Sequence, residues 1–508
     1  MVVAFSVTGR EVFRPTGPLY MTPKLTPTPT GGCGSVSGSH GTLRPSAFTV
    51  AARLAGRDRV FLMNTLSDAQ AIASADVLEL FDRLRCGELD SESLPSDQQA
   101  AVAELAEYGF LTPGPEADRA TLEAHFAALR DSRNELRLTV LTTLQCNCAC
   151  AYCFQGAQAG NGGPTTHMSL ETAAMVVGWI ERQLDEVRPE RLILTFFGGE
   201  PLLNLPVLYY LAERAWRAAS ARGVEQVVNI ITNGLLLNPE LVDRLAPYGL
   251  NGVKVTLDGD RETHDRLRPL RGGQPTFDRI VENVRRVADR CAVSIGGNFD
   301  ASSAGRYPAL LDYLSRQDFA PRLARITFKP IVGQGAATAG AGNGQMPGDR
   351  PGGCMTFAGA GAGGPATCAL LDKQMAMLRE ETKKRGFQTA DGLHMGPCEL
   401  HQRHAHTIGP DGSLYACGGF AGDPRLSTGH IDGRRDPLRE AAARRFEELA
   451  PWRRCGDCPF IPVCGGGCAV ASQTELGDMN APTCHRASFE SALLEVAEAM
   501  ATHDQEPS

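Results

Sequence analysis

Cysteine spacing is the feature that most constrains this chain, because its 16 cysteines fall largely into two arrays. The first array is compact and stands in LQCNCACAYCFQG, where Cys146, Cys150 and Cys153 have the spacing CxxxCxxC. The second extends from Cys398 to Cys484 in the C-terminal part. Thiols at such short intervals are typical of metal ligands. We therefore expect both arrays to bind metal.

Composition supports this interpretation because it indicates a reducing compartment. No apolar run of the chain reaches about 18 residues, the length of a membrane span. The first ten residues, MVVAFSVTGR, lack the basic start and the apolar length of a signal peptide. We therefore expect a cytoplasmic protein with no membrane partner, in which thiols stay reduced. The net charge of −8 and the absence of a long basic run disfavour nucleic acid as a partner.

The periodicity of the chain predicts several domains. Six strand-like runs alternate with helical patterns between residues 136 and 332, which indicates an α/β fold with a parallel sheet of βα units. Strand-like runs followed by helical ones favour a small winged-helix-like module before it. The predicted organisation is a disordered leader (1–45), the winged-helix-like module (46–115), a connector (116–135), the βα region (136–332), a Gly- and Ala-rich insert (333–367), a Cys-rich domain (368–490) and a tail (491–508).

The first array favours an iron–sulfur cluster. Three thiolates on one loop can hold three irons of a [4Fe–4S] cube and leave the fourth iron open for a cofactor. The loop follows a predicted parallel strand, where α/β folds place their ligand sites. A zinc knuckle is the alternative, but zinc needs a fourth protein ligand and the loop offers no His. Cys148 would break the spacing and is predicted to be a bystander.

The second array lies where helical and strand periodicity weaken. Its last part has the spacing CxxCx₅Cx₃C, and metal ligation would supply the constraint that apolar burial cannot. A thiolate-rich ribbon with two zinc ions is the plain alternative. The array consists of Cys398, Cys417, Cys455, Cys458, Cys464, Cys468 and Cys484.

The first array resembles the motif of the radical S-adenosylmethionine (SAM) superfamily, with the aromatic Tyr152 before its last cysteine. Segments FFGGEPLL, NIITNG and VTLDG end three successive predicted strands, and DGDRETHDRLRP follows, as in that family. Singly these segments have plain interpretations, such as a tight turn or a solvated acid, and His264 and Asp265 could be surface residues. Their common order favours the family.

This resemblance implies a partial (β/α)₆ barrel whose first array holds a [4Fe–4S] cluster. It also implies reductive cleavage of SAM to a 5′-deoxyadenosyl radical that abstracts hydrogen from a C–H bond. A one-electron donor such as a flavodoxin or ferredoxin would be required. The implied SAM-binding residues are Gly198, Gly199, Glu200, Asn233 and Tyr152.

The second array resembles a SPASM domain, the auxiliary-cluster module of radical SAM peptide modifiers. Two auxiliary [4Fe–4S] clusters are implied, for three clusters in all. The fourth ligand of the first auxiliary cluster stays open between Cys368, Cys354 and a vacant position. The implied ligands are Cys398, Cys417 and Cys468 for the first auxiliary cluster, and Cys455, Cys458, Cys464 and Cys484 for the second.

Radical SAM proteins with SPASM domains mostly modify ribosomally made peptides or mature an active-site residue of a sulfatase. Residues 46–115 resemble the winged-helix element that binds a precursor's leader peptide by strand addition. Sulfatase maturases carry an acidic base after the cysteine that matches Cys417, whereas this chain has Gly418 there. We therefore predict an oxidoreductase-type radical SAM enzyme that cross-links or otherwise modifies a precursor peptide.

The alternatives are a sulfatase-maturase-like activity, a non-catalytic iron–sulfur electron carrier, and an RNA-modifying radical enzyme, which would need a basic surface. The precursor, the modified residues and the bond formed stay open.

Overall fold

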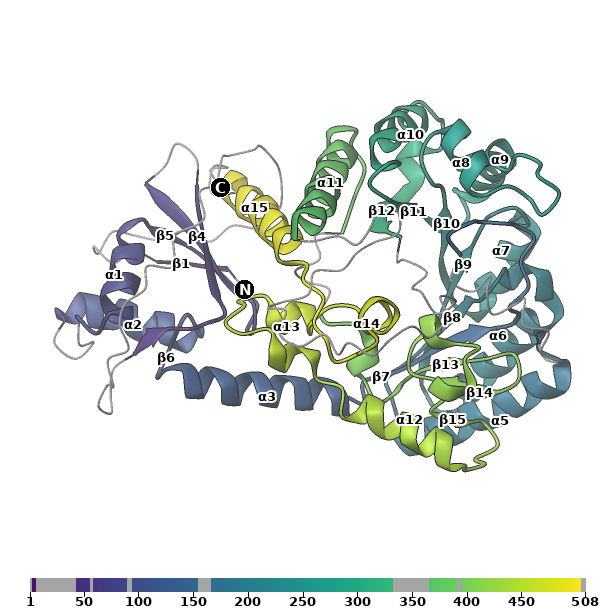
Figure 1. The fold of residues 1–508 in the computed structure, drawn as a ribbon, viewed down its shortest axis with the longest axis horizontal. Coiled ribbons are helices and arrows are strands. Elements are labelled where there is room, and N and C mark those ends of the chain that lie inside the picture. The colour runs from purple at the N-terminus through teal and green to yellow at the C-terminus, as the bar shows by residue number, and fades with distance from the viewer. Residues whose placement is uncertain are drawn as a thin grey trace, which may run out of the picture.

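The computed structural model describes residues 2–5, 43–54, 58–88, 94–153, 166–331, 365–390, 393 and 396–503. A small N-terminal module lies on one side, a large sheet with its helices on the other, and C-terminal segments lie between them (Figure 1). Most of the predicted leader and of the Gly- and Ala-rich insert, with Cys33 and Cys354, lies outside the described residues. The first residues of the predicted leader nevertheless form a strand, β1 (Val2–Phe5).

Six parallel strands form the central sheet, as the sequence predicted. Each buries alternate side chains against the covering helices; on β8, for instance, Leu192, Leu194 and Phe196 are buried. Strands β12 and β7 stand at opposite ends of the six and do not pair, so the barrel is open. The strands are β7 (Glu135–Leu141), β8 (Arg191–Phe197), β9 (Glu225–Thr232), β10 (Leu250–Thr256), β11 (Ala292–Phe299) and β12 (Leu323–Pro330).

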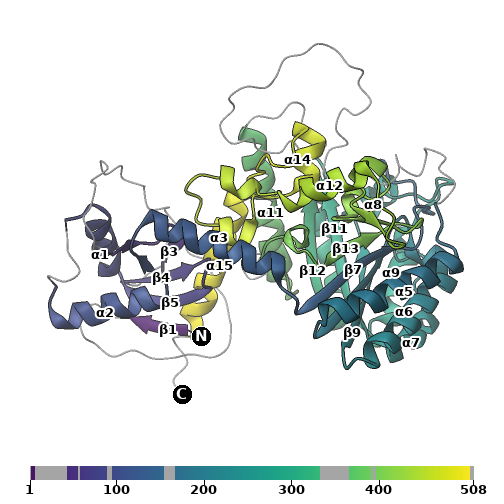
Figure 2. The same cartoon turned by 90° about the horizontal axis from the view of Figure 1, so that it is seen from below.

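Helices cover the outer face of this sheet (Figure 2). Side chains cap several of them: Ser169 accepts a hydrogen bond from Thr172 N (3.0 Å), and Asn238 accepts one from Leu241 N (2.9 Å). The inner face is thereby left free to hold a site. The helices are α5 (Leu170–Val187), α6 (Leu205–Ser220), α7 (Pro239–Leu245), α8 (Arg261–Leu267), α9 (Phe277–Val287) and α10 (Tyr307–Ser315).

The Cys-rich domain continues the barrel sheet. Its strand β13 (Ala405–Ile408) pairs in parallel with β7, and β14 (Ser413–Tyr415) and β15 (Gly429–His430) extend the sheet to nine strands. Backbone hydrogen bonds therefore fix this domain relative to the barrel. Its helices are α11 (Pro365–Lys384), α12 (Pro437–Glu447), α13 (Ile461–Cys464), α14 (Ala469–Leu476) and α15 (Arg486–His503).

The N-terminal module is an antiparallel meander followed by two helices. Its sheet has the order β1-β5-β4-β3, and β1 pairs in parallel with β5. One face, including Val60 and Leu62, packs with residues of the two helices, and the other, including Phe61 and Met63, packs with residues of α15. The elements are β3 (Thr49–Arg53), β4 (Arg59–Asn64), β5 (Ala69–Ser74), α1 (Asp76–Arg85) and α2 (Ser96–Glu107), with β2 (Arg44–Pro45) pairing β6 (Leu111–Thr112).

Helix α3 (Pro115–Asp131) joins the module to the rest of the chain. Its Phe126 stacks on Trp452 of the Cys-rich domain, with ring centroids 4.5 Å apart and planes 8° apart. Both side chains are buried. None of the described helices combines the length and the apolar character needed to cross a membrane.

Replacing Phe126 by Ala should lower the free energy of unfolding by about 3–5 kcal/mol, because it leaves a cavity against Trp452. Thermal unfolding of the iron-loaded protein under anaerobic conditions measures the loss. Arg119→Ala, an exposed change on the same helix, should stay within about 0.5 kcal/mol of the parent. Equal stability of the two variants would contradict the packing role.

Candidate active site

The first cysteine array lies on the loop that follows β7, at the carboxyl end of the sheet. The turn after β8 docks its backbone on this loop: Gly199 N donates to Thr143 O (2.9 Å) and Glu200 N to Gln145 O (2.8 Å). A Cβ at Gly199 would lie 2.1 Å from Gln145 O, and Gly198 has φ +135° with Thr143 O at 2.3 Å from its Cβ position. The two glycines are therefore required for close backbone approach to the cysteine loop.

Glu200 ties two strand ends together. Its carboxylate is fully buried and accepts hydrogen bonds from Leu202 N (3.1 Å), Thr232 Oγ1 (2.7 Å) and Asn233 N (2.8 Å). Burial raises the pKa of Glu200 to about 7, although these hydrogen bonds oppose the rise. The interpretation of Glu200 as a solvated acid is therefore wrong.

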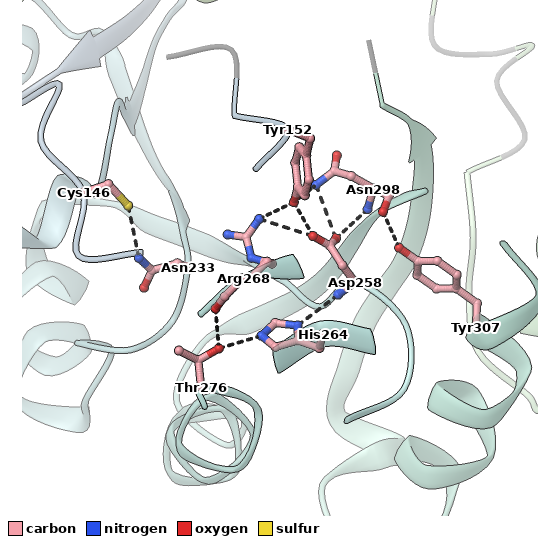
Figure 3. Close-up of polar contacts among 9 residues, drawn as sticks. All are labelled: Cys146, Tyr152, Asn233, Asp258, His264, Arg268, Thr276, Asn298 and Tyr307. Carbon is pink, nitrogen blue, oxygen red and sulfur yellow. Dashed lines mark hydrogen bonds and ion pairs between the residues drawn. The ribbon is translucent and has the colours of Figure 1, made fainter. Parts of the chain in front are cut away.

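Asn233 reaches the cysteine loop from the end of β9. Its Nδ2 donates to Asn147 Oδ1 (2.7 Å) and lies 3.7 Å from Cys146 Sγ (Figure 3). The pKa of Cys146 is lowered to about 6, mainly by a hydrogen bond with the Cys148 thiol against the effect of burial. The environment of Cys146 thus favours the thiolate, which is the form that binds metal.

Cys148 is buried between the predicted ligands. Its thiol hydrogen-bonds with those of Cys146 and Cys150, and these contacts, with burial, strongly raise its pKa. The backbone beside it is held by a bond from Ala149 N to Pro269 O (2.8 Å). Cys148 therefore stays protonated where its neighbours lose their protons more readily.

Tyr152 anchors the far end of the loop to the barrel (Figure 3). Its hydroxyl hydrogen-bonds with the carboxylate of Asp258 and accepts from Arg268 Nη1 (2.5 Å) and Asn298 Nδ2 (3.3 Å). Arg268 Nη1 lies 3.4 Å from Asp258, which is fully buried and also accepts from Asn298 N (2.7 Å). Three strand-end segments thus meet at one buried ion pair. Burial, above all, raises the pKa of Tyr152 and keeps the phenol neutral.

His264 supports this network from below (Figure 3). It is fully buried, and burial together with Arg268 lowers its pKa to about 3. Its Nδ1 accepts from Asp258 N (3.1 Å), so Nε2 carries the proton and donates to Thr276 Oγ1 (3.0 Å). Asp265 accepts from Thr276 N (2.7 Å) and Phe277 N (2.9 Å). The interpretation of His264 as a surface residue is therefore wrong.

Electrostatic interactions link the C-terminal thiols in two groups, and their role as cluster ligands stays a prediction. Cys398 and Cys417 each interact electrostatically with Cys468, and burial raises the pKa of both. Within the other set, Cys464 interacts with Cys455, Cys458 and Cys484, and Cys455 also with Cys458 and Cys484. No disulfide joins any of the described cysteines. The possible fourth ligand Cys368 lies on α11 in a part whose side chains are not described, and Cys354 lies outside the described residues.

The chemistry of the donor sets, which consist of cysteine thiols, suits iron–sulfur clusters. In the described part of the chain, no three His, Cys, Asp or Glu side chains are arranged to hold one metal ion. Thiols around a four-iron cube stand farther apart than thiols around one zinc. Besides Cys148, the first loop carries three thiols, one with a pKa near 6. The positively charged Arg268 acts on two of them, which suits an anionic cluster. We therefore regard all three sets as cluster sites by prediction.

Sequence reasoning missed Asp258, Arg268 and Asn298 as functional residues. The first two lie in segments whose only signal is the resemblance to the family, and Asn298 lies in a predicted strand. An arginine within RETHDRLRP gives no local signal of burial, because its partners come from other strand ends. All five predicted SAM-binding residues lie on the loop or at the strand ends beside it.

Comparisons with known proteins agree with this geometry. Residues 140–297 match the model of the Radical SAM superfamily, which confirms the resemblance. The Fe-coproporphyrin III synthase of Methanosarcina barkeri is 28% identical over 195 residues, covering 37% of this chain and 42% of that protein. The serine-type anaerobic sulfatase-maturating enzyme of Bacteroides thetaiotaomicron is 24% identical over 352 residues, covering 64% of this chain and 80% of that enzyme.

The fold is also shared with a solved structure, native anSMEcpe with bound AdoMet and Kp18Cys peptide. The TM-score is 0.51 at 16% identity, over 70% of this chain and 96% of that one. At this identity the likeness shows the fold alone. Since the chain spans less than half the length of the first of these relatives, its substrate and partners are matters for proposal.

Replacing Gly199 by Ala should displace the cysteine loop, because the new Cβ would meet the Gln145 carbonyl at 2.1 Å. We expect iron bound at the first array to be lost, with SAM cleavage falling in parallel. Iron analysis and 5′-deoxyadenosine formation measure the two effects. Gly305→Ala, where a Cβ meets nothing within 4 Å, is the matched control. Full iron content in the Gly199 variant would refute the close-approach argument.

Replacing Arg268 by Met should leave the Asp258 charge buried without its cation. We expect a loss of about 3–5 kcal/mol in the free energy of unfolding. The double variant with Asp258→Asn should recover part of this loss, since the uncompensated charge is gone. Arg266→Met, exposed on the same helix, is the control. Thermal unfolding of the parent, the single variants Arg268→Met and Asp258→Asn, the double variant and the Arg266→Met control tests the pair. If the effects of the two single changes simply add, the two residues do not interact.

Proposed function

We propose that this radical SAM enzyme modifies a ribosomally made precursor peptide, by a cross-link or a related change. The observation that carries the proposal is the shared sheet. Because β13 pairs with β7, the Cys-rich domain is fixed beside the carboxyl ends of the barrel strands. Gly418 follows Cys417, and a Cβ added at Gly418 would lie 3.6 Å from Phe197 Cδ1 at the end of β8. Two auxiliary cysteine sets beside a radical SAM loop are typical of peptide modifiers.

The residues of the chain have distinct tasks in this scheme. Cys146, Cys150 and Cys153 would bind the first cluster, and the Gly198–Gly199 backbone fixes their loop. When bound, the first cluster and SAM would supply a radical that abstracts hydrogen from carbon. The auxiliary clusters would accept the electron that is released when a cross-link forms. The closed packing around Asp258 keeps the loop rigid and water away from one side of the site.

SAM would bind at the strand ends. The backbone of Gly198, Gly199 and Glu200 borders the cysteine loop, and Asn233 and Tyr152 complete the edge. The Glu200 carboxylate already accepts three hydrogen bonds from the protein. Its role would therefore be to position the backbone at the strand ends and to give that side of the SAM site a negative charge. A flavodoxin or ferredoxin would supply the electron.

The N-terminal module would hold the leader segment of the precursor by strand addition. Its sheet ends in β3 on one side and in β1 on the other. Strand β1 comes from the start of the same chain and covers the edge of β5. A leader peptide would therefore add beside β3 or take the place of β1.

A sulfatase-maturase-like reaction is the second candidate, because the relative with 80% coverage is a sulfatase-maturating enzyme. This chain has Gly418 and Gly419 where such enzymes carry an acidic base after the matching cysteine. A side chain at position 419 would meet Val470 Cγ2 at 2.6 Å, so only position 418 has room for one. Formylglycine formed on a synthetic sulfatase peptide, with no product from precursor peptides, would favour this candidate instead.

Anaerobic reconstitution with iron and sulfide tests the proposal first. We expect about twelve irons per chain, as three four-iron cubes require, and reductant-dependent 5′-deoxyadenosine. Short peptides encoded beside the gene are then assayed for mass changes. Zinc in place of iron, or no deoxyadenosine, would refute the radical chemistry. About four irons with active SAM cleavage would remove the auxiliary clusters and the main support for a peptide substrate.

Replacing Cys458 by Ser should remove about four irons per chain while SAM cleavage continues and peptide product is lost. The reason is that Cys458 is assigned to the second auxiliary set, where it interacts with Cys464, and not to the three cysteines of the first loop. Cys291→Ser changes a half-buried thiol outside all three sets and should leave iron and product unchanged. Wild-type iron content in the Cys458 variant would contradict its assignment as a ligand.

A further inference from the structure

The inner face of strands β10 and β12 carries three basic side chains, Lys254, Arg325 and Lys329. Their neighbours in the strands, such as Val253, Val255 and Ile326, are buried in the core under the outer helices. Because side chains alternate along a strand, the three cations point to the opposite, inner face. Strands β10, β11 and β12 lie side by side at the open edge of the barrel (Figure 1).

Register brings these cations together. Lys254 pairs with Ser294 of β11, and Ser294 pairs with Arg325 of β12. A Cβ at Gly296, two residues along β11, would lie 2.5 Å from Lys254 Cε and 3.5 Å from its Nζ. The lysine stem therefore runs across Gly296 toward the end of β12 that holds Lys329.

Within the described part of the chain, no anionic side chain pairs with these cations. Among the described residues, none of the three side chains has an ion pair or a side-chain hydrogen bond. Burial, together with the charges of Lys329 and Arg325, lowers the pKa of Lys254 to about 8. The nearby carboxylate Glu399 pairs instead with Arg137 at 2.8 Å. Strand β11 separates β10 from β12, and the like charges on this one face repel one another across it. A bound anion would offset that repulsion.

The cations lie between the radical loop and the auxiliary cysteines. Lys329 pairs with Asn298, whose Nδ2 donates to Tyr152 of the loop (3.3 Å). Gly296, beside the lysine ammonium, is two residues from Asn298, about 7 Å along the strand. Lys329 is also close enough to Cys398 to act on the pKa of its thiol. An anion held here would sit inside the barrel, next to the position of SAM.

We propose that Lys254, Arg325 and Lys329 bind the side-chain carboxylate of an Asp or Glu in the peptide substrate. This inference rests on the proposed function and gives its substrate a chemical requirement, an acidic residue next to the modified one. The arginine guanidinium offers a fork that matches a carboxylate, and the lysines add point charges. The carboxylate of SAM offers the same chemistry, so the test separates the two sources.

The experiment measures binding to the iron-loaded, SAM-bound enzyme without turnover. The probes are the capped tripeptides acetyl-Gly-Glu-Gly-amide and acetyl-Gly-Gln-Gly-amide, which differ only in one carboxylate. We expect the Glu probe to bind about tenfold more tightly than the Gln probe, and Lys254→Gln or Arg325→Gln to abolish that preference. Arg279→Gln, exposed on α9, is the control and should keep it.

Three results would overturn the site. Equal binding of the two probes by the parent enzyme would show that no carboxylate is selected. An unchanged preference in Arg325→Gln, an exposed position that leaves folding intact, would show that the cations do not select it. A Kd for SAM that rises about tenfold in Lys254→Gln, with no change for the probes, would assign the charges to SAM. Because the probes need no turnover, the two proposals can fail separately. Selective binding without peptide modification would contradict only the proposed function, and modification without selective binding would contradict only this site.

Discussion

The close contact between the Gly198–Gly199 backbone and the loop after β7 determines where the chemistry can occur. Two backbone hydrogen bonds and two missing Cβ atoms bring the turn after one strand onto the loop after its neighbour. The three cysteines are thereby positioned by the sheet and not by their own loop alone. A flexible loop with three thiols would pay an ordering cost on binding metal, whereas a docked loop has met that cost during folding.

The buried ion pair below Tyr152 has the same effect at the other end of the loop. Removing Arg268 and Asp258 from water is unfavourable, and their mutual attraction offsets this only with the hydrogen bonds from Tyr152 and Asn298. Such a network adds little to the free energy of unfolding. It does fix the geometry, because each side chain supplies hydrogen bonds that the other buried polar groups need. The loop is therefore held in one arrangement relative to β10 and β11.

Sequence patterns over a few consecutive residues predicted the features that such residues determine. The six strands and the cysteine sets were accessible because side-chain alternation and ligand spacing are written in consecutive residues. The buried state of His264 and the role of Arg268 were not, because they depend on partners from other strand ends. The pairing of β13 with β7 was not predicted, because the four residues Ala405–Ile408 carry no signal that says which strand edge they join. The ligand and SAM assignments remain predictions.

The open edge of the sheet at β12 explains why a charged inner face can persist. An edge strand such as β12 has neighbours on one side only, so its inner residues are free of the packing that fills closed barrels. Arg325 and Lys329 lie on that edge strand and Lys254 lies two strands further in, and none of the three has a carboxylate partner among the described residues. The unbalanced charge lowers stability, and a protein retains such an arrangement where the missing partner arrives with the substrate. Under the proposed function, the open side of the barrel that would admit a peptide also carries the charges that would select it.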